Sequence, residues 1–118
     1  MTMNEIDILQ KRLKQFAVER DWEQFHAPKN LAMALIVEAA ELVEHFQWLT
    51  EQQSRDLAAD KLQEVAFELA DIFIYSLRLA ERLDIDLLDT VNKKIAINEQ
   101  KYPVEKVKGS SKKYTEYS

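Results

Sequence analysis

Hydrophobic positions recur every three or four residues along most of this chain, which is the spacing that gathers side chains on one face of an α-helix. Four segments show the pattern, and we predict a helix over each of residues 4–20, 31–49, 55–83 and 86–100. Thr2 with Glu5 predicts a capping box before the first segment, and Asn30 and Asp86 are the predicted N-caps of the second and fourth. The pattern therefore indicates an all-α protein.

The connections between these segments differ in character. Residues 21–30, DWEQFHAPKN, break the helical pattern because Pro28 disfavours helix at Ala27. This stretch also holds Trp22, Phe25 and His26, which is more aromatic than most loops, although core packing is an ordinary role for such rings. Residues 50–54 form a short polar connection, which favours antiparallel packing of the two long segments. Pro103 is expected to close the last helix, so we predict a domain over residues 1–103 and a polar, lysine-rich tail over residues 104–118.

Acidic residues interrupt the two most apolar segments at matching intervals. Glu38 and Glu41 share one helical stripe with Trp48, and Glu68 and Asp71 share another with Tyr75. Carboxylates in apolar surroundings are costly unless something pairs with them. Each pair is therefore predicted to have a partner, although any single acid is more often an ordinary solvated surface group.

Composition narrows the possible classes of protein. The 118 residues include one Gly, two Pro and no Cys, which suits one helical domain and excludes disulfides, thiolate catalysis and zinc–thiolate sites. The net charge of −5 argues against binding to a nucleic acid polymer. No uncharged apolar run reaches membrane-spanning length and no secretory signal pattern is present, so we expect a cytoplasmic protein without a membrane partner.

The apolar residues of the second segment exceed what one small bundle can cover. Ile36, Val37, Leu42 and Val43 point around most of the helix circumference, so they do not all fit one core. We therefore expect a homo-oligomer, either an obligate dimer or a dimer of dimers.

A metal site is the simplest partner for the two acid pairs. If the two long helices pack antiparallel, Glu38 and Glu41 face Glu68 and Asp71. Unit charges 4 Å apart repel by about 4 kcal/mol at an effective dielectric constant of 20, so the pKa values rise or a cation binds. Oxygen ligands select Mg²⁺ first and Mn²⁺ second. Lys94 in the fourth segment offers positive charge for phosphate groups.

The arrangement Glu38-x-x-Glu41 followed by Glu68-x-x-Asp71 resembles the ExxE…ExxD signature of the all-α nucleoside triphosphate pyrophosphohydrolases, the MazG-like superfamily. Three further stretches are similar to its dCTP pyrophosphatase branch, namely residues 21–31, residues 46–48 and the tail residues 111–116. The resemblance implies a four-helix MazG-like bundle completed by oligomerisation, commonly as a tetramer.

The resemblance also implies an activity, which is Mg²⁺-dependent cleavage of the α–β phosphoanhydride of a (deoxy)nucleoside triphosphate, such as dCTP, to monophosphate and pyrophosphate. The family's metal ligands correspond to Glu38, Glu41, Glu68 and Asp71. We expect Glu41, with Glu38 beside it, to orient or deprotonate the attacking water. The substrate-binding residues implied by the same comparison are Trp22, His26 and Trp48 for the base, Tyr75 near the metal, and Lys94 and Asn98 for the phosphates.

Two other classes of protein remain open on the sequence. A carboxylate-bridged di-iron bundle requires Glu-x-x-His on paired helices, whereas His45 lies four residues after Glu41 and has no counterpart in the third segment. A non-catalytic helical dimerisation module would use the same acids as ordinary surface charge.

Overall fold

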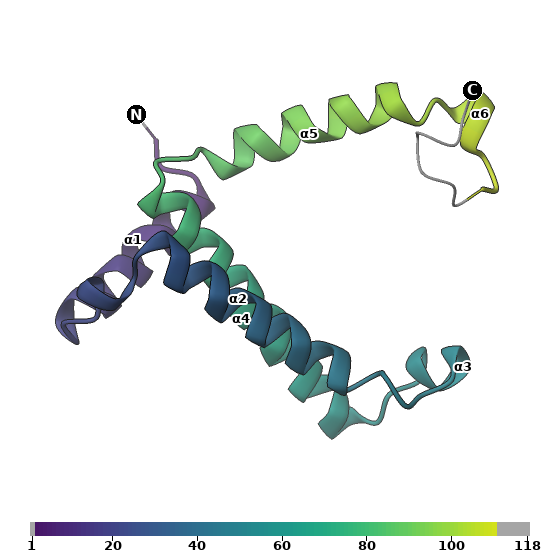
Figure 1. Ribbon diagram of the computed structural model, residues 1–118, viewed down its shortest axis with the longest axis horizontal. Coiled ribbons are helices and arrows are strands. Elements are labelled where there is room, and N and C mark those ends of the chain that lie inside the picture. Colours follow the sequence, from purple (N-terminus) through teal and green to yellow (C-terminus); the bar gives the residue numbers. More distant parts are fainter. Residues whose placement is uncertain (1, 111–118) are drawn as a thin grey trace. The chain divides into compact units, whose positions relative to one another are not determined.

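The computed structural model describes residues 2–110 and confirms the all-α prediction (Figure 1). Within these residues there are six α-helices, one short 3₁₀ helix and no strand. Their bounds are α1 Glu5–Glu19, η1 Glu23–Phe25, α2 Pro28–Glu44, α3 Glu51–Ser54, α4 Ala59–Arg82, α5 Leu87–Lys101 and α6 Val104–Val107. The part of the predicted tail beyond residue 110, with its resemblance over residues 111–116, lies outside the described residues.

The N-termini of the first two long helices differ from the prediction. Asn4, not Thr2, caps α1: its side chain accepts from the Asp7 N–H at 2.8 Å, and Asp7 returns the capping-box bond. Helix α2 begins at Pro28 rather than Leu31, because a proline at the first helical position loses no hydrogen bond and already has a helical φ. Asn30 is consequently inside the helix, where its amide donates to the Phe25 carbonyl at 3.1 Å.

The connection between the two long helices is more ordered than the sequence suggested. Thr50 and Gln53 form a capping box that supports the single turn of α3, so α4 begins at Ala59 rather than near Arg55. The predicted cap of α5 is confirmed, since the Asp86 side chain accepts from the Asp89 N–H at 3.0 Å. Pro103 follows α5, but it serves as the N-cap of α6.

Residues up to Ile85 form one compact unit, in which α2 and α4 lie side by side (Figure 1). The two helices are antiparallel, as predicted: His45 after the end of α2 contacts Lys61 near the start of α4, and His26 before α2 contacts Arg78 near the end of α4. Helix α1 packs on the C-terminal half of α4, where the Gln10 amide donates to the Leu77 carbonyl at 3.0 Å. The fully covered apolar core is small and consists of Ala17, Leu31, Val65, Leu77 and Ala80.

The second compact unit begins at Asp86 and contains α5 and α6. Lys93 and Asp89 form an i, i+4 ion pair at 2.8 Å on the surface of α5. Lys94 and Asn98 lie on this same helix and are exposed.

Of the four apolar residues that the sequence could not place in one core, Ile36, Val37 and Val43 are exposed, whereas Leu42 is half-buried. Ile36 is 63% exposed, Val43 is 57% exposed and Phe67 on α4 is 64% exposed. None of the helices in residues 2–110 combines the length and the apolarity that crossing a membrane requires.

Candidate metal centre

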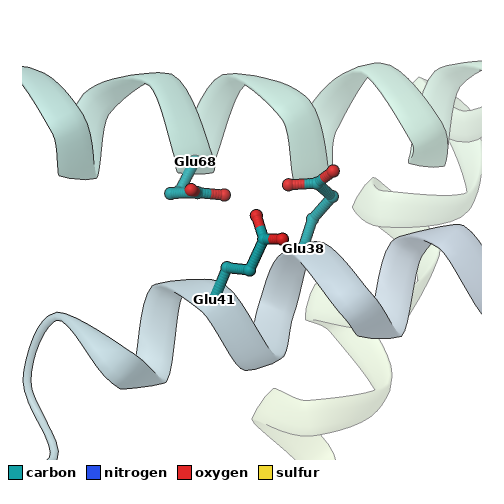
Figure 2. A group of neighbouring side chains, drawn as sticks. All are labelled: Glu38, Glu41 and Glu68. Carbon is teal, nitrogen blue, oxygen red and sulfur yellow. The ribbon is translucent and has the colours of Figure 1, made fainter.

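Three carboxylates meet in the middle of the α2–α4 pair (Figure 2). Glu38 and Glu41 are three residues apart and therefore share one face of α2, while Glu68 points toward them from α4. One oxygen from each lies within 4.8 Å of the others. We refer to these three residues as the acid cluster.

The acid cluster is electrostatically strained in the absence of a cation. Partial burial, followed by hydrogen bonds to Glu68 and Glu41 and by repulsion from Glu41 and Asp71, raises the pKa of Glu38 to about 7. A carboxylic acid with this pKa is half protonated near neutral pH. A positive charge beside Glu38 would therefore relieve the repulsion among these acids.

Asp71, the fourth predicted ligand, lies one helical turn beyond Glu68 on α4. It is outside the acid cluster as defined by distance, yet its charge contributes to the raised pKa of Glu38. Burial and then the charges of Glu38 and Asp71 raise the pKa of the Tyr75 phenol, so this hydroxyl faces the same acidic surroundings.

Glu68 carries the observation that best fits a bound cation. Its Oε2 is buried and has no hydrogen-bond partner in the described part of the chain. A carboxylate oxygen in that state costs free energy unless a donor or an ion compensates it. The ligand atoms offered are all carboxylate oxygens, which is the donor set that Mg²⁺ and Mn²⁺ prefer.

His45 lies between the acid cluster and a nearby ion pair. Its Nε2 is 3.9 Å from Glu68 Oε1, and its Nδ1 is 3.4 Å from the Lys61 ammonium. Lys61 in turn pairs with Glu64 at 3.1 Å. Glu64, one helical turn before Glu68 on α4, thus pairs with a lysine and is not part of the acid cluster.

We call residues 21–27 the aromatic connector. A pocket of about 290 Å³ opens beside Asp71, between α1, α4 and this connector. Trp22 packs its ring edge to face against Phe16 with centroids 5.7 Å apart, and lies 6.4 Å from the His26 ring. We call the 290 Å³ pocket the aromatic pocket. Its lining residues are Leu13, Phe16, Ala17, Trp22, His26, Asp71, Ile74, Tyr75 and Arg78. Trp22, His26 and Tyr75, predicted from the sequence as substrate-binding residues, thus gather next to a predicted metal ligand.

The aromatic connector is held to α4 by ion pairs that the sequence did not reveal. Glu23 accepts from Arg78 at 2.7 Å and from Arg82 at 3.0 Å. The hydrogen bond from Arg78 is the main cause that lowers the pKa of Glu23. Two features of the sequence are consistent with these ion pairs: the i, i+4 spacing of the two arginines and the presence of an acid among the aromatic residues. The spacing alone does not predict which acid the arginines contact.

Trp48, the third residue predicted for the base, does not line this pocket. Trp48 lies in the turn after α2 and is 86% exposed. It is separated from Trp22 and His26 by the whole of α2, which at 17 residues is roughly 25 Å long. Lys94 and Asn98 are on α5, in the second unit.

The site thus consists of an antiparallel helix pair that brings acids together across its interface, with an aromatic pocket alongside. The family comparison names the class of protein. A model of the MazG-like family matches residues 33–117, and the chain belongs to that family.

Individual relatives agree with this assignment. The chain is 44% identical to dCTP pyrophosphatase 1 of Mus musculus over 104 residues and 47% identical to dCTP pyrophosphatase 1 of Homo sapiens over 109 residues. Each alignment covers 86% of this chain and 61% of the relative, so the chain spans about three fifths of the length of these curated proteins. A solved pyrophosphatase from Archaeoglobus fulgidus DSM 4304 superposes with a TM-score of 0.81 at 35% identity, over 87% of this chain and 96% of that one.

Proposed function

We propose that this protein is a nucleoside triphosphate pyrophosphohydrolase, which cleaves the α–β phosphoanhydride to release a monophosphate and pyrophosphate. The observation that carries the proposal is the acid cluster, in which three carboxylates from two helices approach within 4.8 Å in a member of the MazG-like family. The names of the similar proteins, dCTP pyrophosphatase 1 and a pyrophosphatase, support the same reaction class.

The acid cluster and Asp71 are the proposed ligands of Mg²⁺, with Mn²⁺ as a substitute. Bound there, a divalent cation would screen phosphate charge and lower the pKa of a coordinated water. Glu68 fits this role because its buried Oε2 has no other partner among residues 2–110. Glu38 fits because burial and the neighbouring acids raise its pKa to about 7, an effect that a nearby cation would oppose.

We assign the removal of a proton from the attacking water to carboxylates of α2. A carboxylate within hydrogen-bond reach of the attacking water is the general base that such a hydrolysis needs. We assign this role to Glu41, which lies in the acid cluster, and give Glu38 the part of holding Glu41 and the water in place.

The aromatic pocket is the proposed site of the nucleobase. Rings of Trp22 and His26 line it, and base stacking on aromatic side chains contributes about 1–3 kcal/mol for each base. Tyr75 and Asp71 line the same pocket, so a base held there would extend its phosphates toward the acidic residues. A deoxycytidine-type triphosphate is the proposed substrate on the strength of the relatives' names.

A second copy of the chain is proposed to complete the catalytic domain, residues 1–103, with residues 104–118 as its tail. Ile36, Val43 and Phe67 are more than half exposed, and apolar faces of this kind are covered in obligate oligomers. The same assembly, a dimer of dimers, would bring Trp48 of one copy to the aromatic pocket of another. Lys94 and Asn98 are proposed to bind the substrate phosphates within it.

The test is a panel of nucleoside triphosphates incubated with the protein and Mg²⁺, with product identity as the readout. Pyrophosphate together with monophosphate is the expected result, and dCTP is expected to rank among the best substrates. Orthophosphate with diphosphate would indicate a different phosphohydrolase. If no nucleotide turns over and Mg²⁺ leaves the melting temperature unchanged, the protein is instead a non-catalytic helical module.

A further inference from the structure

Arg78 is the one charged side chain that is buried within residues 2–110, and the proposed reaction does not use it. It is 3% exposed and lines the aromatic pocket from α4. Its guanidinium donates to Glu23 at 2.7 Å and to Glu81 at 3.2 Å. A third contact reaches His26, whose Nδ1 is 3.2 Å from the same Nη2 that binds Glu23.

The contact with His26 defines which nitrogen of the imidazole carries the proton. A guanidinium has only donors, so Nδ1 must present its lone pair to make this hydrogen bond. A proton on Nδ1 would place two donors face to face at this distance. The proton of the neutral ring is therefore on Nε2, and His26 is one of the residues that line the pocket.

The surrounding contacts hold His26 in this position. Arg82 donates through Nε to the His26 carbonyl at 3.1 Å and through Nη1 to Glu23 at 3.0 Å. Both sides of the aromatic connector are thus tied to α4 by arginines. Partial burial and the positive charge of Arg78 lower the pKa of His26, against the opposing effect of Glu23, which agrees with a neutral ring at neutral pH.

We propose that Arg78 is a positioning residue that holds His26 of the aromatic pocket as the Nε2–H tautomer. The imidazole then presents a hydrogen-bond donor to the pocket. This donor selects a base with an acceptor edge, such as the 2-oxo group of a pyrimidine. This rests on the proposed function for the identity of the ligand. The tautomer itself rests only on the contacts of Arg78 and can be measured without any substrate.

Nitrogen NMR of the full chain labelled with ¹⁵N-histidine tests the tautomer directly. The chain has two histidines, His26 and His45, so a spectrum of His45→Gln assigns the signals. The expected result is a protonated Nε2 and an unprotonated Nδ1 at His26, and a mixture of tautomers in Arg78→Met. A protonated Nδ1 in the unsubstituted chain, or an unchanged His26 pattern in Arg78→Met, would overturn the proposal.

Removal of Arg78 takes away the shorter of the two ion pairs of Glu23 and leaves it only Arg82, so a second variant guards against misfolding. The double variant Glu23→Gln with Arg78→Met removes both charges of the buried pair, while Arg82, which is 32% exposed, keeps its bond to the His26 carbonyl. It is expected to fold and to show the same mixture of His26 tautomers. A folded double variant that retains the single Nε2–H form would also contradict the assignment.

The functional consequence is tested by comparing dCTP with 2-deoxyribose 5-triphosphate, which lacks a base. For Arg78→Met we expect KM for dCTP to rise by about tenfold with kcat reduced less than threefold, since loss of one oriented donor is worth on the order of 1 kcal/mol. Arg78→Lys is expected to recover part of the loss. Arg55→Lys, an exposed ion-pair residue outside the pocket, is the matched control and should retain the original KM.

The outcomes separate this proposal from the proposed function. Equal losses for dCTP and for the triphosphate without a base, with KM unchanged, would make Arg78 merely structural and overturn the proposal. If the unsubstituted chain turns over no triphosphate, the proposed function fails, while the histidine spectra still decide whether Arg78 sets the tautomer.

Discussion

Glu38 shows how one residue takes its properties from a neighbouring helix. On α2 alone it would be an ordinary glutamate, but partial burial together with Glu68 and Glu41 raises its pKa to about 7. The sequence identified this residue correctly as unusual, because an acid inside an apolar helical segment needs a partner. The sequence also predicted that the pKa values of these acids rise unless a cation binds, and the raised pKa of Glu38 agrees with that prediction.

Substitution of Glu38 by Gln tests its assignment as a ligand. We expect turnover to fall at least about 100-fold, since a neutral amide offers Mg²⁺ a weaker ligand while the side chain keeps nearly the same shape. The measurement is pyrophosphate release under saturating nucleotide, with circular dichroism to verify helical content. Asp71→Asn should behave in the same way, and full activity in either variant would refute the ligand assignment.

The raised pKa of Glu38 also predicts a pH dependence of stability in the presence of EDTA. The ordinary value is 4.5 and the folded value is about 7, so the folded chain holds more protons than the unfolded chain between these limits. The free energy of unfolding should therefore decrease as pH rises from 4.5 through 7. Chemical denaturation across this range measures it.

The matched control for this pH dependence is Glu38→Gln, which removes the titrating group and should flatten that part of the profile. Added Mg²⁺ should restore stability above pH 7, because the ion replaces the proton. A profile in EDTA that is identical for both proteins would show that Glu38 titrates normally.

The ion pairs of Glu23 with Arg78 and Arg82 could not be predicted from the sequence. These side chains meet across 55 and 59 positions of sequence. Periodicity predicts which residues share a face of one helix, whereas the fold of an irregular segment such as residues 21–27 determines what that face meets. Trp22 and His26 were noted as aromatic residues in a connector, but the buried arginine beneath them was not foreseen.

At the scale of elements, helix existence was predictable and helix ends were not. Both long helices and α5 lie where the apolar spacing placed them, and their antiparallel packing followed from the short polar connection. The start of α1 is set by its capping box, whereas α2 and α4 begin without a side-chain cap. Pro28 starts α2 three residues early, and Thr50 with Gln53 makes α3 from a stretch that looked like a plain loop.

The capping box of α1 gives a direct test of this distinction. Asn4→Ala should lower the free energy of unfolding by about 1 kcal/mol, because the Asp7 N–H loses its side-chain acceptor. Thr2→Ala is the control, since Thr2 was the predicted cap but does not serve as one in the structure. Urea denaturation of both variants measures the difference, and equal destabilisation would show that the Asn4 cap contributes nothing.

At the scale of the whole molecule, the core is too small for the amount of apolar surface that α2 and α4 present. Five apolar residues are buried in the described part of the chain, while Ile36, Val37, Val43 and Phe67 remain more than half exposed. The sequence predicted this excess, since the second segment is apolar around most of its circumference. It could not say which face is covered by which copy, because periodicity describes each helix by itself.

Ile36→Glu tests the proposed oligomer. A charge in the centre of a buried apolar face costs several kcal/mol, so we expect the assembly to dissociate toward monomers. Light scattering coupled to size-exclusion chromatography measures the mass. Lys29→Glu, an exposed polar position of the same helix, is the control and should leave the mass unchanged. A monomeric unsubstituted chain would contradict the oligomer.

The two tryptophans lie in different surroundings, so their intrinsic fluorescence can report on two different events. Trp22 is 44% exposed and lies against Phe16 and His26, whereas Trp48 is 86% exposed at the far end of α2. Emission from Trp48 should therefore shift to shorter wavelength when copies associate, while emission from Trp22 should be quenched by a stacked base. Titration of Trp48→Phe with nucleotide, and of Trp22→Phe by dilution, would record ligand capture and self-association as separate fluorescence signals.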